Sequence, residues 1–99
     1  MSYKTEFPEF DHTVPVLSSN WVDSSWHNDV CPSFENDKLK PNHIIKLWID
    51  FKNEDLRDIN NGFIYNIVLQ DSEGQYLDDF YCSNSESDLL DFIAGLEAK

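Results

Sequence analysis

Residues 44–51 read Ile44-Ile45-Lys46-Leu47-Trp48-Ile49-Asp50-Phe51, and this short stretch decides the fold class. Successive side chains of an extended chain point to opposite faces, so the apolar residues at 45, 47, 49 and 51 would share one face. The opposite face would carry Lys46, Trp48 and Asp50. A period of two sustained over eight residues indicates a half-buried β-strand.

Two further strands are predicted after it. A polar connection follows the first strand, with a helical turn expected around Glu54 to Arg57 and a turn at Asn61-Gly62. The run from Phe63 to Leu69 is rich in β-branched and aromatic residues. The four residues 71–74, Asp-Ser-Glu-Gly, then connect this run to a second one from Tyr76 to Cys82. Two such runs joined by a short glycine-containing turn predict a β-hairpin.

The last part of the chain predicts a helix over residues 85–98. Ser85 is followed three residues later by Asp88, which resembles a capping box at a helix start. Apolar residues then recur at helical spacing and form one stripe: Leu89, Phe92, Ile93 and Leu96. The helix should therefore pack on one face of the sheet.

Residues 1–43 lack a sustained period and contain or border on all four prolines, Pro8, Pro15, Pro32 and Pro41. Only Val14–Leu17 is predicted there as an edge strand, because Pro15 cannot donate to a central ladder. We expect one α+β domain over residues 1–99. It comprises an irregular and edge segment (1–43), an antiparallel meander of three or four strands (44–82) and a C-terminal helix (85–98) packed on one face.

No apolar run is long enough to span a bilayer, and the first six residues lack the apolar core of a signal peptide. A cytoplasmic location is therefore expected. In such a compartment the two cysteines, Cys31 and Cys82, are expected to be reduced and buried rather than paired.

Charge is the most informative property of this sequence. Nineteen acidic residues against seven basic ones give a formal net charge of −12. Between Asp58 and Ala98 there are nine carboxylates and no Lys or Arg. A field of this sign disfavours direct binding to nucleic acid and to anionic membranes, and it favours a partner with a basic surface.

Carboxylates on a rigid scaffold present charges much as nucleic-acid phosphates do, so they suit a basic groove. The predicted contact surface combines acidic residues of the hairpin and helix with two aromatic anchors, Trp48 and Tyr81. Its acidic members are Asp71, Glu73, Asp78, Asp79, Glu86, Asp88 and Asp91.

This surface predicts a small, non-enzymatic inhibitor that engages a nucleic-acid-binding protein by charge complementarity. A DNA-mimic-like anti-defence protein of a phage or mobile element, such as an anti-CRISPR or anti-restriction protein, fits this description. An immunity protein that neutralises a nuclease toxin fits it as well. A third reading assigns the charge to solubility alone.

A competing hypothesis concerns His27, Asp29 and Cys31, which alternate in the sequence. In an extended strand they would share one face and could begin a metal site, with His12 or His43 as a fourth ligand, or serve an enzymatic thiol. This spacing matches no common zinc pattern, and buried cysteines usually serve packing. We therefore expect no metal and no cofactor.

Overall fold

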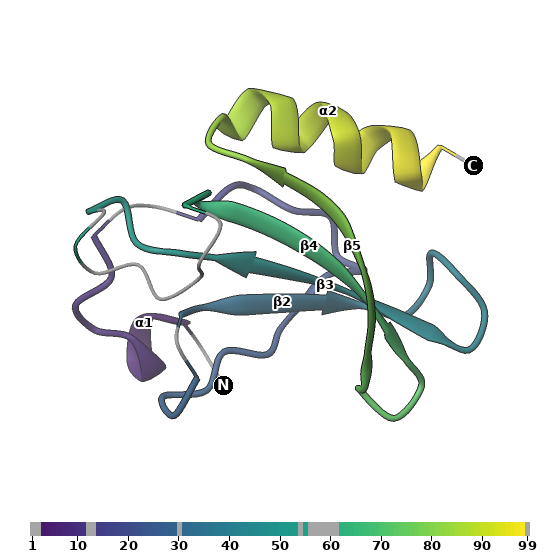
Figure 1. Ribbon diagram of the computed structural model, residues 1–99, viewed down its shortest axis with the longest axis horizontal. Helices are drawn as coiled ribbons and strands as arrows, with labels where there is room; N and C mark the ends of the chain where they lie inside the picture. Colours follow the sequence, from purple (N-terminus) through teal and green to yellow (C-terminus); the bar gives the residue numbers. More distant parts are fainter. Residues whose placement is uncertain (1–2, 12–13, 30, 54, 56–61, 99) are drawn as a thin grey trace.

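A computed structural model describes residues 3–11, 14–29, 31–53, 55 and 62–98, and it has an α+β architecture (Figure 1). One antiparallel sheet runs in the order β1-β2-β3-β4-β5, with a four-residue helix α1 (Tyr3–Glu6) before it and α2 (Glu86–Glu97) after it. The strands are β1 (Val22–Asp23), β2 (Ser33–Asn36), β3 (His43–Ile49), β4 (Tyr65–Asp71) and β5 (Tyr76–Ser83). The predicted α+β meander with a C-terminal helix is confirmed, with five strands rather than three or four.

The register of the sheet explains where the core lies. Leu47 of β3 pairs with Phe34 of β2 and Ile67 of β4, and Ile67 pairs with Tyr81 of β5. Paired residues share a face, so this row forms part of one apolar side, the core face. Leu47 and Ile67 are completely buried there. The alternation that predicted β3 reflects the burial of Ile45, Leu47 and Ile49 on this face.

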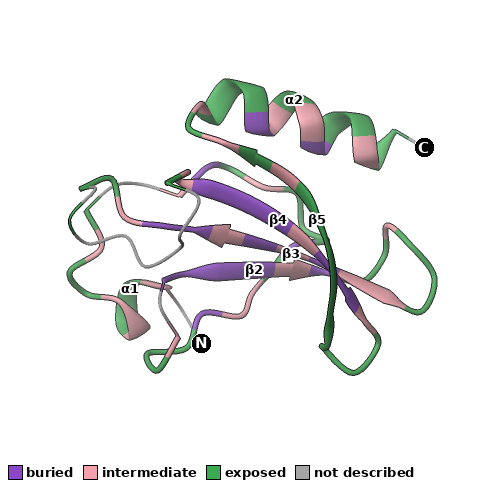
Figure 2. Ribbon diagram, in the orientation of Figure 1, coloured by how far each residue is buried: buried purple, intermediate pink, exposed green. Residues whose placement is uncertain are grey.

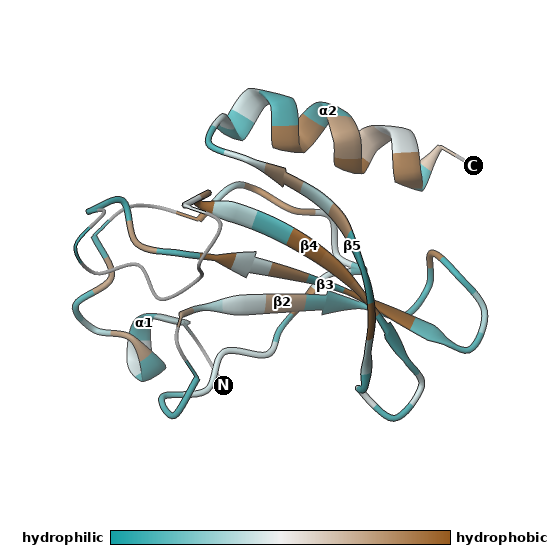
Figure 3. Cartoon of the chain, viewed as in Figure 1, coloured by the Kyte–Doolittle hydropathy of each residue, from teal (hydrophilic) through white to brown (hydrophobic). Residues whose placement is uncertain are grey.

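Helix α2 covers the core face. Ser85 caps it, because its hydroxyl accepts a hydrogen bond from the Asp88 N–H. Leu89 and Ile93 are buried on the side of α2 that faces the sheet, whereas the outer side is polar and exposed (Figures 2 and 3). Phe92 stacks on Tyr81 with ring centroids 4.2 Å apart. The predicted apolar stripe therefore docks the helix.

The segment from Val14 to Trp21 also packs against the core. Trp21 is buried, and Val14 and Leu17 contact the core cluster. The edge strand predicted for Val14–Leu17 is wrong, since these residues form no strand. Pro15 is buried and has no N–H to donate, so this segment is held by packing rather than by a ladder.

Two strands were missed in the segment predicted as irregular. In β2, the buried positions include Ser33 and Asn36. The Ser33 N–H donates to the Ser25 hydroxyl at 3.1 Å, which satisfies one of these buried polar groups.

The helical turn predicted around Glu54 to Arg57 lies, except for Asp55, outside the described residues, as does Asn61.

Candidate interaction surface

Strand β5 carries the centre of the predicted contact surface. It is the last strand of the sheet, and within the described part of the chain it pairs only with β4. Its first five residues, Tyr76 to Phe80, are all exposed (Figure 2). The pairing with β4 shifts register twice, between Ile67 and Val68 and between Leu69 and Gln70. These bulges bend β5 and increase its local twist.

At one end of β5 lies the hairpin tip with Asp71 and Glu73. One oxygen of the Asp71 carboxylate accepts hydrogen bonds from the N–H groups of Glu73 and Gln75, each at 2.9 Å. Gly74 supplies the positive φ of 87° that the turn requires. Asp71 therefore stabilises the turn, and Glu73 is fully available at its tip.

Along β5 lie two adjacent carboxylates, Asp78 and Asp79, that point to opposite faces of the sheet because they pair with Leu69 and Val68. The Asp78 carboxylate accepts the Asp79 N–H at 2.9 Å. A side-chain hydrogen bond to the Asp79 carboxylate raises the pKa of Tyr76, with smaller contributions from desolvation and from the charges of both aspartates. Tyr76 and Asp79 thus form a polar pair on the edge strand.

At the other end of β5 the chain turns into α2, where Glu86, Asp88 and Asp91 are exposed. Carboxylates in the first turn of a helix are favoured by its dipole, so Glu86 and Asp88 also stabilise the start of α2. Burial, together with the charge of Glu86, raises the pKa of Tyr65.

We call these seven carboxylates the acidic β5–α2 surface. They are Asp71, Glu73, Asp78, Asp79, Glu86, Asp88 and Asp91. No ion pair joins any of them to a residue that the structure describes. The eight residues of β5 span about 26 Å at 3.3 Å per residue. A nucleic-acid strand of that length carries about eight phosphates, whereas β5 itself carries two carboxylates, Asp78 and Asp79, with the other five on the turn and on α2.

The two predicted aromatic anchors lie on opposite faces of the sheet. Tyr81 is half-buried on the core face, where it stacks on Phe92, so its ring already contributes to helix docking. Trp48 lies on the other face, which we call the Trp48 face. The Lys46 ammonium lies 4.3 Å from its ring centroid and 3.4 Å from the Glu35 carboxylate. Trp48 is thus half-buried within a polar cluster.

Sequence reasoning missed the apolar part of this edge. Tyr76, Leu77 and Phe80 are 56%, 48% and 37% exposed. They were assigned to an ordinary strand, in which alternate side chains are covered, and the two bulges break this alternation. No signal in the sequence marks the bulges.

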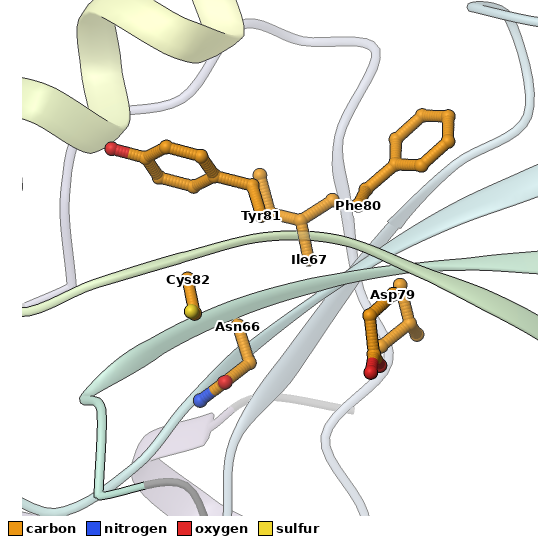
Figure 4. Close-up of a pocket in the computed structure, with 7 residues that line it drawn as sticks. Asn66, Ile67, Asp79, Phe80, Tyr81 and Cys82 are labelled. Atoms are coloured by element: carbon orange, nitrogen blue, oxygen red, sulfur yellow. The ribbon is translucent and has the colours of Figure 1, made fainter.

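A hollow of about 270 Å³ lies at the first bulge, between β4 and β5. Figure 4 shows Asn66, Asp79 and Cys82 on one side of the strands, with Tyr81 and Phe80 on the other. Since Asn66 pairs with Trp48, the first three belong to the Trp48 face. The hollow therefore combines an amide, a carboxylate and a thiol.

The extended strand assumed for His27, Asp29 and Cys31 is wrong. The Asp29 N–H donates to the Trp26 carbonyl at 2.9 Å, which makes this segment a turn. His27 is exposed, and its Nδ1 atom lies 3.0 Å from Oε1 of Glu6, within hydrogen-bond distance. Cys31, in contrast, is completely buried. Among the residues described, no three His, Cys, Asp or Glu side chains are placed to hold a metal ion, and His12 lies outside them.

No disulfide joins Cys31 to Cys82. The expected burial is confirmed for Cys31 and is wrong for Cys82, which is exposed. Cys82 lies on β5, on the Trp48 face, which α2 does not cover.

No protein-family model, curated protein or solved structure matches this chain. None of the helices in the described ranges has the length and apolar character needed to cross a membrane.

Proposed function

We propose that this chain is a binding protein that occupies a basic, nucleic-acid-binding surface of a partner protein and thereby inhibits it. The observation that supports the proposal is the acidic β5–α2 surface, seven exposed or half-exposed carboxylates on one edge strand, its turn and its following helix. The partner's surface would be lined by Lys and Arg, as in enzymes that hold nucleic acid.

The arrangement suits this role for an electrostatic reason. The backbone that carries the carboxylates belongs to a sheet and a capped helix, so little backbone freedom is lost on binding. A net charge of −12 also steers a basic partner toward the chain over a Debye length of about 10 Å at 0.1 M salt. Association should be fast at low salt and slow at high salt.

An anti-defence inhibitor, such as an anti-CRISPR or anti-restriction protein, is the form of this function that we favour. Such a protein would compete directly with the DNA or RNA of the effector it inhibits. It would need no catalytic group and no cofactor of its own.

The test compares two variants with the same net charge. The first replaces Asp78, Asp79 and Asp88 by Lys, which raises the formal net charge by six, from −12 to −6. The second makes the same change at exposed acidic residues elsewhere, Glu9, Asp37 and Asp55. Each protein is immobilised and used to capture basic proteins from a bacterial lysate at low salt, with and without added duplex DNA.

The proposal is supported if a nucleic-acid enzyme binds the wild-type chain and the second variant but not the first variant. Added duplex DNA should displace that enzyme. The first variant should associate on the order of 10- to 1,000-fold more slowly. Equal capture by both variants would contradict the proposal, because binding would then depend on net charge and not on the acidic β5–α2 surface. Capture of a nuclease toxin in this way would identify an immunity protein instead.

A further inference from the structure

The edge of β5 has features that charge alone does not explain. We propose that it receives an extended basic segment of the partner as an added antiparallel strand, with an apolar side chain of that segment over the hollow beside Cys82. This inference rests on the proposed function for the charge of the partner, and it adds the way in which the partner is held.

The first argument comes from the backbone. β5 is eight residues long, and β4 is its only strand neighbour in the described part of the chain. No hydrogen bond between described backbone groups joins β5 to any element other than β4. An exposed edge of this length is a template for a further strand, since its outward N–H and C=O groups lack ladder partners.

The second argument comes from the apolar side chains. Among the residues described, six large hydrophobic side chains are exposed, and three of them, Tyr76, Leu77 and Phe80, lie on β5. Their concentration on one strand, beside a 270 Å³ hollow, provides contact area on both faces of an added strand. Diagonal side chains of neighbouring strands lie about 7–8 Å apart. Long or aromatic side chains on an added strand could therefore contact Tyr76, Leu77 and Phe80.

The third argument decides between a foreign segment and a second copy of this chain. Antiparallel pairing of β5 with another β5 would bring Asp78 and Asp79 of both copies together, and each copy carries a net charge of −12. Like charges opposite one another destabilise a strand pair. A segment that alternates basic and apolar residues removes this repulsion and supplies ion pairs. Charge complementarity therefore selects a basic partner segment.

The test uses the intact chain and a synthetic peptide of about eight residues that alternates Lys and Val, a length that matches one strand. Amide hydrogen exchange and amide chemical shifts are measured by NMR with and without the peptide. The control peptide has the same sequence and charge, but every backbone nitrogen is methylated, so it cannot donate to a ladder.

The proposal predicts that the first peptide slows exchange about tenfold or more at β5 amides that exchange freely in the unbound chain. The control peptide should leave these rates unchanged. The added strand would be refuted if both peptides changed amide chemical shifts over β5 and α2 and neither slowed amide exchange at β5. That outcome would leave the proposed function intact, because charge complementarity needs no ladder.

A second measurement tests the hollow. Alkylation of Cys82 with a bulky maleimide is selective, because Cys31 is completely buried. Alkylation should lower the affinity for the Lys-Val peptide by about tenfold. The Cys82→Ser variant should bind this peptide with the affinity of the wild type. Equal affinity of the adduct and the wild type would remove the hollow from the binding site.

Discussion

Leu89→Ala is the substitution that tests most directly how α2 is held. Leu89 is completely buried and belongs to the core cluster between α2 and the sheet. Removal of its side chain leaves a cavity under the first turns of the helix, where Asp88 and Asp91 are presented. The expected loss is about 2–5 kcal/mol, the usual range for a buried Leu→Ala change.

The size of the effect follows from burial. Leu90, the next residue, is only half-buried, so Leu90→Ala should cost roughly 1 kcal/mol. Domains of this size have a free energy of unfolding of about 5–15 kcal/mol. For about 100 residues, each kcal/mol lowers Tm by about 4–8 °C, so Leu89→Ala should lower it by roughly 8–40 °C.

The free energy of unfolding would be measured by urea denaturation, with tryptophan fluorescence and far-ultraviolet circular dichroism as probes. Leu90→Ala is the matched control, since it removes the same atoms from the same helix. If the two variants lose the same free energy, Leu89 does not dock α2 and the packing argument is refuted. A fluorescence transition that differs from the dichroism transition would show that α2 unfolds separately.

Three other measurements test individual contacts. Ser85→Ala removes the α2 cap and should cost about 0.5–2 kcal/mol in the same urea assay, and a change below the error would show that the cap is dispensable. A hydrogen bond from His27 lowers the pKa of Glu6, so Glu6 contributes stability above its unfolded pKa of 4.5 that is lost as pH falls through the lower folded value. The stability difference between the wild type and Glu6→Gln should therefore narrow below pH 4.5, and a constant difference from pH 3 to 7 would argue against this hydrogen bond. With a thiol reagent, Cys82 should react in the native protein and Cys31 only after unfolding, so fast reaction of both would contradict the burial of Cys31.

Strand β3 and helix α2 could be predicted because their burial has a simple period, whereas β4 and β5 were predicted from β-branched and aromatic runs joined by a short turn. Ile45, Leu47 and Ile49 alternate with partly exposed neighbours in β3, and Leu89 and Ile93 recur at helical spacing in α2. In β2 the pattern fails because Ser33 and Asn36 are buried polar residues, which hydropathy assigns to the surface. β1 is only two residues long, too short for any period.

The candidate site was predictable in its charge and not in its shape. The run without Lys or Arg identified Asp78 and Asp79, and the structure places them on β5, which pairs only with β4 among the residues it describes. The exposure of Leu77 and Phe80 results from shifts in register with β4, which depend on tertiary pairing. The extended strand expected from the alternation of His27, Asp29 and Cys31 was wrong for a related reason, because a hydrogen bond from the Asp29 N–H to the Trp26 carbonyl forms a turn there.

The contact between Ser18 and Glu97 has a consequence for synthesis of the chain. Its 2.8 Å hydrogen bond joins residues 79 positions apart, beside the place where Val14 and Leu17 reach the core. The sheet is complete at Ser83, 14 residues before Glu97, and a ribosome adding about 5–20 residues per second needs about 0.7–3 s to cover those residues. During this time the sheet lacks Leu89 and Ile93 on its apolar face, so the nascent chain is exposed to aggregation until α2 emerges. Expression at reduced temperature with a holdase chaperone should therefore raise the yield of soluble protein.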